Sequence, residues 1–170
     1  NILKTLGIPK GNQYICFHSR DSVYLDSLGS NTMDWSYHNY RDSNIQNYIF
    51  AAEEMVKRGF FAIRMGSEVK EKINTNNPYI IDYAKSEIRT DFNDIYLGSH
   101  CRFFLCSDCG ISIIPEMFRI PTVYVNWTLL LNISTWVING IFIFKKFYLR
   151  KEDRLLTFFE MLNIELDGDK

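Results

Sequence analysis

Residues 14–21 read Tyr14-Ile15-Cys16-Phe17-His18-Ser19-Arg20-Asp21, a short apolar run that changes abruptly into polar residues. Gly7, Pro9 and Gly11 come just before this run and end the helix with which the chain opens. A continuous apolar run between turn residues is typical of a strand that is buried on both faces of a parallel sheet. The sequence therefore predicts a buried strand with polar side chains at its carboxyl end.

The alternation of strands and helices continues along the rest of the chain. Such an alternation produces a mostly parallel sheet through right-handed crossovers, with helices on both faces. We therefore predict an α/β fold with a Rossmann-like sheet, in which ligands bind beyond the carboxyl ends of the strands. Further strands are expected at residues 60–65, 80–83, 102–106, 122–125 and 141–148, and helices at 43–58, 91–98, 111–118 and 154–163.

Three of these helices are expected to have one apolar face available for packing. Ser43 and Gln46 have the spacing of a capping box, and Asp91 is expected to cap the second helix. Apolar residues recur at helical spacing after each of these starts. The predicted faces are Ile45, Tyr48, Ile49, Ala52 and Met55 in the first helix, Phe92, Ile95 and Tyr96 in the second, and Leu155, Phe158, Phe159 and Leu162 in the last.

Length and composition exclude several classes of protein. The chain has 170 residues, which suits one domain or one lobe of a larger enzyme. Hydrophobic residues make up 46% of it and charged residues 23%, values that exclude a disordered chain. The formal net charge of -1 provides no basic field for nucleic acid or for an anionic membrane. A phosphate-bearing ligand would therefore have to be held by local groups, and no nucleic-acid partner is expected.

The chain divides into three expected parts. Residues 1–12 are interpreted as the end of an interdomain helix with its linker, residues 13–150 as one Rossmann-like domain, and residues 151–170 as a C-terminal helix and tail. Because residues 2–6 read as a helix already in progress, we expect the chain to be part of a longer protein. The clustered cysteines favour a reducing compartment. The expected location is the cytoplasm, with peripheral association at the inner face of the membrane as an alternative.

Residues 127–144 form the one segment that raises the question of a membrane span. The segment contains Asn132, Asn139 and Gly140 among other polar or small residues. Few membrane-spanning helices contain so many polar residues. We therefore expect a loop followed by a buried strand in this segment.

The first candidate site is the polar end of the strand at residues 14–17. An arginine that leaves a strand end can place its forked guanidinium around a diphosphate, and a nearby carboxylate can orient it. Arg20 and Asp21 have these two roles in our interpretation, with His18 beside them. The alternative is a surface ion pair between Arg20 and Asp21 next to a packed histidine.

The second candidate site is Ser107-Asp108-Cys109-Gly110, which follows the strand predicted at residues 102–106. A hydroxyl group, backbone N–H groups next to a glycine and the start of a helix can together cradle a phosphate. Glu116 lies one or two helical turns later, where a carboxylate can bind both hydroxyls of a ribose. The alternative is an ordinary capped turn with an exposed glutamate.

The third candidate site is the loop Asn74-Thr75-Asn76-Asn77-Pro78, which could bind sugar hydroxyls through Asn74 and Asn76. Arg64, at the end of the strand predicted at residues 60–65, is a further candidate for sugar binding. Asparagine, threonine and proline are also the residues from which turns are built. For the loop itself, an ordinary turn is the favoured interpretation.

The four cysteines allow two other interpretations. Cys106 and Cys109 form a Cys-x-x-Cys motif between a strand and a helix, as in thioredoxin-like redox proteins. The interval from Cys109 to Pro121 is too short for the helix and strand that such a fold requires. His100, Cys101, Cys106 and Cys109 would suffice for zinc, but the first two are adjacent and Cys106 belongs to a buried strand. We therefore expect no bound metal, and cysteines that are buried as small apolar side chains.

Several blocks of sequence, in a fixed order, resemble a family of bacterial glycosyltransferases found among genes for surface polysaccharides. The family is similar to glycosyltransferases of the two-lobed GT-B architecture, whose C-terminal lobe binds the nucleotide sugar. His18-x-Arg20-Asp21 is also similar to the His-x-Arg-Arg diphosphate motif of transferases that use GDP-fucose, with Asp21 in place of the second arginine. The blocks, within about residues 5–127, are 17–21, 37–43, 64–66, 74–78, 91–92, 94–98 and Pro115-Glu116 with Phe118.

The resemblance implies that this chain is the nucleotide-sugar-binding lobe of such an enzyme, acting with a second, N-terminal lobe. The donor sugar would be transferred to a polysaccharide or glycan acceptor without a metal or other cofactor. Arg20 would bind the donor diphosphate together with Asp21, and His18 and Arg20 would be the catalytic residues. The phosphate cradle would be Ser107, Asp108 and Gly110, and the ribose would be held by Glu116.

Two other functions stay open at this point. Polysaccharide pyruvyl transferases have a similar two-lobed fold, and a non-catalytic nucleotide- or glycan-binding module would need a similar pocket. In a two-lobed transferase the reaction takes place between the lobes, where the acceptor is held in line with the donor. Because this positioning can contribute roughly 7–11 kcal/mol, we expect the chain alone to bind donor without turning it over.

Overall fold

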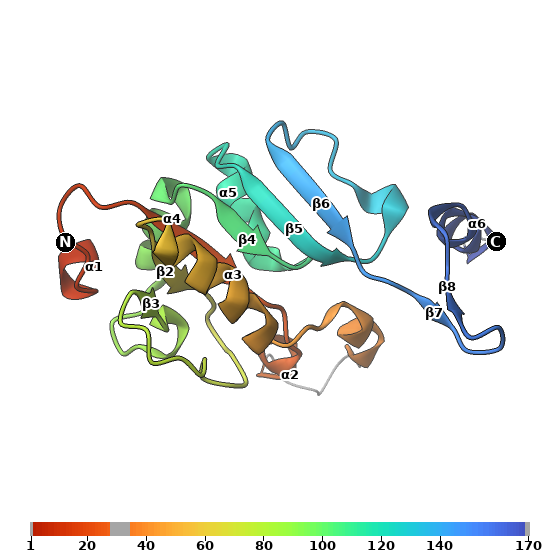
Figure 1. Cartoon of the computed structure of the whole chain (residues 1–170), viewed down its shortest axis with the longest axis horizontal. Coiled ribbons are helices and arrows are strands. Elements are labelled where there is room, and N and C mark those ends of the chain that lie inside the picture. Colours follow the sequence, from red (N-terminus) through yellow and green to blue (C-terminus); the bar gives the residue numbers. More distant parts are fainter. Residues whose placement is uncertain (1, 28–34, 169–170) are drawn as a thin grey trace.

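The computed structural model describes residues 2–27 and 35–168, with side chains described as far as residue 164. Its centre is a six-stranded sheet with the order β3-β2-β1-β4-β5-β6, and each pair of neighbouring strands is parallel. The predicted α/β, Rossmann-like sheet is therefore confirmed (Figure 1). The strands are β1 (Tyr14–His18), β2 (Phe61–Arg64), β3 (Ile80–Ile81), β4 (Phe104–Cys106), β5 (Thr122–Trp127) and β6 (Gly140–Phe144).

Helices cover both faces of the sheet. Figure 1 shows α3 (Gln46–Lys57) in front of the sheet and α5 (Ile113–Met117) behind it. The helix α4 (Asp91–His100) lies on the same side as α5, and Gly98 lets the two helices approach closely. A Cβ atom at Gly98 would lie only 2.8 Å from Cγ2 of Ile114, so any larger residue would push the helices apart. The shorter helices are α1 (Ile2–Thr5), α2 (Val23–Ser27), and the 3-10 helices η1 (Ser36–Arg41), η2 (Tyr83–Lys85), η3 (Gly110–Ser112) and η4 (Leu130–Asn132).

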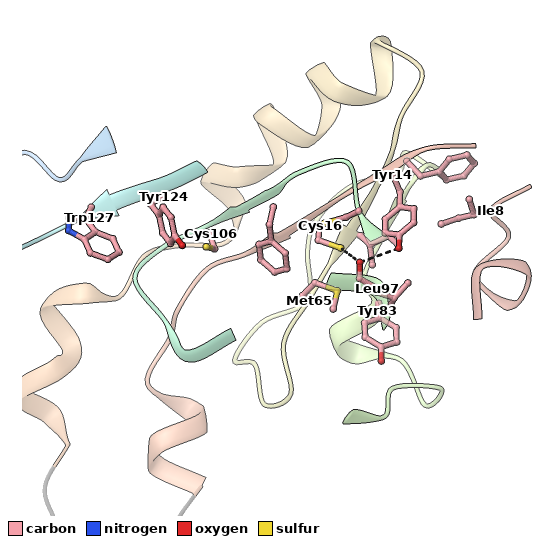
Figure 2. Packing of buried hydrophobic residues seen from close by; sticks show 13 residues of the cluster. Ile8, Tyr14, Cys16, Met65, Tyr83, Leu97, Cys106, Tyr124 and Trp127 are labelled. Carbon is pink, nitrogen blue, oxygen red and sulfur yellow. Dashed lines mark hydrogen bonds between the residues drawn. The ribbon is translucent and has the colours of Figure 1, made fainter. Parts of the chain in front are cut away.

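In β1 to β5, alternate residues enter different apolar clusters, one on each face of the sheet. On the α3 side, Ile15 and Phe17 pack with Tyr48 and Ala52, as the helical spacing predicts. On the α4 side, Tyr14 and Cys16 belong to the cluster in Figure 2. The Tyr14 hydroxyl donates to the carbonyl oxygen of Leu97 at 3.1 Å, and the Cys16 thiol donates to the same oxygen at 3.5 Å. Burial on both faces explains why the strand at residues 14–17 is apolar without alternation.

The predicted capping box at the start of α3 does not form. The Ser43 hydroxyl instead lies 2.8 Å from the Ser19 hydroxyl and 3.2 Å from that of Tyr48. The helix begins at Gln46, and the side chain of Asn44 accepts a hydrogen bond from the Gln46 N–H at 2.8 Å. Ser43, which the local spacing assigns to the helix cap, thus binds Ser19 just beyond the end of β1.

The predicted inward face of α4 is also wrong. The helix is capped by Thr90, whose Oγ1 accepts the Asn93 N–H at 3.1 Å, and not by Asp91. Phe92 is 74% exposed and Ile95 is 47% exposed. The buried positions are Asp94, Leu97 and Gly98, while Tyr96 is partly buried against the core. Contact with α5 through Gly98 orients the helix so that Leu97 packs inward while Phe92 and Ile95 face outward.

Residues 127–144 form the end of β5, a loop with η4, and the strand β6, so the predicted loop and strand are present. The prediction of a buried strand is wrong, because β6 is the edge strand and Ile141 and Ile143 are 59% and 53% exposed. The strand predicted at residues 141–148 ends at Phe144. Within the described part of the chain, no helix has the length and apolar character needed to cross a membrane. Beyond β6, a hairpin of β7 (Tyr148–Leu149) and β8 (Arg154–Leu155) leads to α6 (Phe158–Gly168), which lies to one side of the sheet (Figure 1).

The helix predicted at residues 154–163 therefore begins later than expected, and Leu155 belongs to a strand. A capping box explains the actual start. The Glu160 N–H donates to Oγ1 of Thr157 at 3.3 Å, and the Thr157 N–H donates to Oε2 of Glu160 at 2.8 Å. Arg154 also binds Glu160 through two nitrogens, at 2.5 and 2.9 Å, which fixes the hairpin against the helix. The Thr157-x-x-Glu160 spacing was available in the sequence as a helix-start signal.

Candidate functional site

A pocket of about 460 Å³ opens where the strand order changes direction. From β1 the chain continues to β2 on one side, whereas β4 lies on the other side of β1. In open α/β sheets, the carboxyl ends of the strands beside such a switch point form the usual ligand crevice. Here the pocket is lined from the end of β1 by His18, Arg20 and Asp21, and from the segment after β4 by Cys109 and Gly110.

Arg20 is the central residue of this pocket. It is 6% exposed, and its backbone N–H donates to Oγ of Ser107 at 2.8 Å, which joins the ends of β1 and β4. Its Nη1 forms an ion pair with Asp42. Its Nη2 is buried and has no hydrogen-bond partner among the residues that the structure describes. Because an unsatisfied buried donor is costly, this nitrogen is poised to bind an acceptor that enters the pocket.

Asp42 is held in place by backbone contacts. The Ser43 N–H donates to the Arg20 carbonyl oxygen at 3.1 Å, which brings this segment alongside the end of β1. Nζ of Lys145, just beyond β6, donates to the carbonyl oxygens of Tyr40 at 2.8 Å and Asp42 at 3.0 Å. Arg20 is therefore oriented by Asp42, and the expectation that Asp21 orients it is wrong.

Two further arginines line the same pocket. Nη1 of Arg41 lies 3.3 Å from Oδ2 of Asp108, and Nη2 of Arg89 lies 2.7 Å from Oδ2 of Asp94. In both arginines Nε is buried without a partner. Burial lowers the pKa of Arg20, and the positive charge of Arg41 lowers it further. Because the charge of Arg41 destabilises the charge of Arg20, an anion between these two guanidinium groups would be bound favourably.

Asp94 is a buried carboxylate at the edge of this arginine group. It is 7% exposed, and its Oδ1 has no partner. Burial raises the pKa of Asp94, while hydrogen bonds from Tyr83 and Arg89 and the charge of Arg89 oppose that rise. A ligand group that donates a hydrogen bond, such as a hydroxyl, would satisfy this oxygen.

His18 and Cys109 form the polar floor of the pocket. Nδ1 of His18 lies 2.8 Å from the carbonyl oxygen of Met65. Gly66 is needed here, because its φ is 141° and a Cβ would lie 2.7 Å from Cγ1 of Val69 and 3.2 Å from Nδ1 of His18. Burial lowers the pKa of His18, but the negative charge and hydrogen bond of Cys109 outweigh it, so the net shift is upward.

The pKa of Cys109 is lowered to about 5. A hydrogen bond from the Cys106 thiol contributes most, burial opposes the shift, and the charge and hydrogen bond of His18 lower the pKa further. In its protonated form, the Cys109 thiol donates to the Ser107 carbonyl oxygen at 3.0 Å. The structure therefore brings an imidazole and an acidic thiol together at the floor of the pocket.

Asp21 lies at the pocket, but both of its oxygens are engaged by the backbone. Oδ1 accepts the Val23 N–H at 3.1 Å, and Oδ2 accepts the Lys70 N–H at 3.0 Å. Both contacts fix loops that form the wall of the pocket. Asp21 therefore shapes the pocket through these two hydrogen bonds.

The predicted phosphate cradle is only partly at the pocket. Gly110 lines it directly, and Asp108 is joined to it through Arg41. Ser107 is fully buried, and its hydroxyl is engaged by the Arg20 N–H. Glu116 is not among the lining residues. Its oxygens accept hydrogen bonds from Tyr124 at 2.5 Å and from Trp136 at 3.1 Å.

The predicted sugar-binding residues lie away from this pocket. Asn74 and Asn76 are exposed, and the Asn74 N–H donates to Oε1 of Gln46 at 3.0 Å. Their loop is held against α3, where Nδ2 of Asn77 donates to Glu53 at 2.6 Å. Arg64 is 1% exposed, and its Nη1 donates to the carbonyl oxygen of Glu71 at 2.5 Å. The structure thus brings none of these side chains to the pocket, and it supports the interpretation of the loop as a turn.

The four cysteines are unbridged. Among the residues that the structure describes, no group of three or more His, Cys, Asp or Glu side chains could hold a metal ion. His100 is engaged with Tyr96, and Cys101 is buried with its thiol donating to the Gly98 carbonyl oxygen at 3.4 Å. Three cysteines are buried as expected, whereas Cys109 is half-buried and lines the pocket.

Sequence reasoning missed Arg89 and the role of Asp42. Arg41 and Asp42 lie in one of the blocks that carry the resemblance, so position alone could have suggested them. Arg89 precedes the cap of α4 in an unremarkable polar stretch, and no sequence signal connects it to the end of β1.

In comparisons with protein families, with curated proteins and with solved structures, nothing matches this chain.

Proposed function

We propose that this chain is the donor-binding lobe of a metal-independent glycosyltransferase, and that the pocket binds the diphosphate of a nucleotide-activated sugar. The observation that carries the proposal is the unpartnered Nη2 of the buried Arg20, which lies at the strand-order switch point. A free donor on a permanently charged and buried group favours an anionic ligand over a neutral one.

Charge and geometry both fit a diphosphate. Arg20, Arg41 and Arg89 line one pocket, and each retains a buried nitrogen without a partner. A diphosphate offers several acceptor oxygens over a short length, so it could bind more than one guanidinium at once. Gly110 lines the pocket with no side chain to obstruct a ligand that approaches the backbone.

The transfer reaction follows from the same charges. When a sugar leaves a nucleotide diphosphate, negative charge develops on the diphosphate oxygen that bound it. Guanidinium groups already oriented by Asp42, Asp94 and Asp108 would stabilise that charge without reorganisation. This is the role that a divalent metal has in other transferases. The resemblance supplies the remaining elements of the proposal, which are the glycan acceptor and a second lobe.

The test is a binding screen with a matched pair of variants. Calorimetry and thermal shift would measure UDP-, GDP-, CMP- and dTDP-sugars, free diphosphate and phosphoenolpyruvate against the parent chain, Arg20→Ala and Arg58→Ala. Arg58 is the control because it is also ion-paired, to Glu54 at 3.3 Å, but its side chain is 65% exposed. We expect at least one nucleotide sugar to bind the parent and the Arg58 variant equally, and the Arg20 variant more weakly.

Each other result has a definite meaning. Binding of phosphoenolpyruvate in place of the nucleotide sugars would favour pyruvyl transfer. Binding of a nucleotide sugar without transfer by any longer form of the protein, given a pool of glycan acceptors, would favour a non-catalytic module. Equal affinity of all three proteins for every ligand would remove Arg20 from the site and the proposal with it.

A further inference from the structure

We infer that Cys109 is a nucleophilic thiol at the floor of the pocket, a covalent modification site that hydroperoxides oxidise and that Cys106 then converts into a disulfide. The inference goes beyond glycosyl transfer and does not depend on it. It rests on the cluster of Cys106, Cys109 and His18, which the pairing of β1 with β4 and the turn after β4 bring together.

The register of the sheet places the three side chains together. His18 of β1 is the cross-strand partner of Cys106 of β4, and in a parallel pair such partners lie side by side on one face. Cys109 follows Cys106 after the short turn through Ser107 and Asp108, and it lines the same pocket as His18. Nδ1 of His18 is engaged by the Met65 carbonyl oxygen, which leaves Nε2 as the nitrogen available to Cys109.

The four cysteines differ in access. Cys16, Cys101 and Cys106 are buried, whereas Cys109 is half-buried and lines the 460 Å³ pocket. Small electrophiles can therefore reach Cys109 through the pocket without unfolding of the chain. Cys106 lies fully buried in β4, among the core residues of Figure 2, and is not one of the residues that line the pocket, so a reagent in the pocket does not reach it directly.

Charge supports the same assignment. The pKa of Cys109 is lowered to about 5 by the Cys106 hydrogen bond and, against burial, by His18, so the thiolate predominates at neutral pH. Burial raises the pKa of both Cys16 and Cys106, so these cysteines stay protonated. The thiolate is the reactive form of cysteine, and an adjacent imidazolium is one of the usual means of stabilising it.

The oxidation balances with one hydroperoxide per disulfide. The Cys109 thiolate attacks one peroxide oxygen, an S–O bond forms, the O–O bond breaks, and the leaving hydroxide takes a proton from the His18 imidazolium to become water. The Cys106 sulfur then attacks the sulfur of the resulting sulfenic acid. The S–S bond forms, the S–O bond breaks, and the hydroxide that leaves takes the proton of the Cys106 thiol as a second water.

The first experiment oxidises the reduced, metal-free chain with hydrogen peroxide. Remaining thiols are counted with a maleimide after denaturation, and the bridged peptides are identified by mass spectrometry. We expect the loss of two thiols per chain and a bridge between Cys106 and Cys109. Cys106→Ser should stop at a sulfenic acid on residue 109 that dimedone traps, and the matched control Cys101→Ser should still form the bridge. Oxidation confined to Cys16 or Cys101, or no oxidation before the chain unfolds, would overturn the inference.

The second experiment measures the pH dependence of alkylation by iodoacetamide, with the modified cysteine identified by mass. We expect Cys109 to react with a midpoint near pH 5. At pH 6 it should react roughly five- to tenfold faster than an unperturbed thiol, because its larger thiolate fraction outweighs its lower intrinsic nucleophilicity. His18→Asn should move the midpoint upward. A midpoint near pH 8.5 in the parent chain would show that the cluster does not activate Cys109.

A third arm separates this inference from the proposed function. Inorganic diphosphate in the pocket should slow alkylation of Cys109 in the parent chain. If Cys109 is alkylated fast and diphosphate does not slow the reaction, the inference about Cys109 stands and the proposal that the pocket binds a diphosphate is contradicted. Slow alkylation, together with measurable diphosphate binding in calorimetry, would preserve the pocket and overturn the inference about Cys109.

Discussion

Arg20 and Arg64 stand at the carboxyl ends of neighbouring strands, yet only one of them faces a cavity. Arg20 follows β1 and Arg64 ends β2, where it pairs in register with Phe17. Both are more than nine-tenths buried, both bind a carboxylate from another segment, and both have one buried nitrogen without a partner. Arg20 lines the pocket, whereas Arg64 is enclosed by the segment after β2 and donates to the Glu71 carbonyl oxygen at 2.5 Å.

The comparison shows that burial and ion pairing do not identify a ligand-binding arginine. Both properties are shared, and so is the place at the end of a strand. The difference is that the segment after β2 folds back over Arg64, where the Ile73 N–H donates to Oδ2 of Asp82, the partner of Arg64. An arginine that lines a cavity can bind a ligand, whereas an arginine enclosed by the chain can bind only groups of the protein itself.

The largest expected effect is on stability, in Arg64→Ala. The substitution removes one partner of a buried ion pair, and such changes cost about 3–5 kcal/mol. We expect a loss of about 3 kcal/mol in the free energy of unfolding. The loss is at the lower end of the range because Asp82 is partly exposed and still accepts the hydrogen bond from the Ile73 N–H. Denaturant unfolding would measure the change, and Arg58→Ala should cost less than about 0.5 kcal/mol as an exposed control. A loss of ligand affinity in folded Arg64→Ala would contradict the comparison.

The second effect is on affinity, in Arg20→Ala. A hydrogen bond to a charged group contributes about 1.5–3 kcal/mol, so nucleoside-diphosphate affinity should fall roughly 10- to 150-fold. Calorimetry would measure it on protein shown to be folded. Arg20→Lys keeps the charge but loses the forked geometry, and we expect it to recover only part of the affinity. Full recovery by lysine would mean that Arg20 acts as a simple point charge.

The third effect concerns Gly66, which lies two residues beyond Arg64 at the end of β2 and packs against His18, so it connects the two regions. Gly66→Ala should lower the free energy of unfolding by about 1–2 kcal/mol, since its φ of 141° disfavours any side chain. The new Cβ would also press on the His18 ring, so the alkylation midpoint of Cys109 should shift. Gly110→Ala is the control for stability, because no described atom outside its chain neighbours lies within 4 Å of its Cβ position. Equal stability of the two variants, or an unchanged alkylation midpoint in Gly66→Ala, would contradict this account.

The smallest effect is expected for Glu116→Gln. The carboxylate is engaged by Tyr124 and Trp136 and does not line the pocket, so its role there is structural. We expect a stability loss of about 1 kcal/mol and unchanged affinity for both nucleoside diphosphate and free diphosphate. Calorimetry with the two ligands would decide the matter. A loss of affinity for the nucleoside diphosphate alone would restore the ribose contact that the resemblance implies.

The sequence by itself determined the sheet. The apolar runs at residues 14–17 and 104–106 predict strands buried on both faces, and the alternation with helices predicts a parallel sheet. The inward face of α3 was equally predictable, since Tyr48 and Ala52 lie at helical spacing. These features depend on residues close together in the chain, because burial periodicity is a local property. The position of Arg20 and His18 at a strand end follows from the same pattern.

Only the tertiary structure decided which polar groups meet. Asp42 reaches Arg20 because the chain crosses back to the end of β1, and Ser43 leaves the helix cap for the same reason. Cys109 meets His18 because β4 lies beside β1 in the sheet. Arg64 is enclosed by the segment after β2, whereas Arg20 lines the pocket, because the segments that follow the two strands take different paths. Partners of this kind depend on strand order and loop path, and a charged side chain carries no local signal of which distant group will neutralise it.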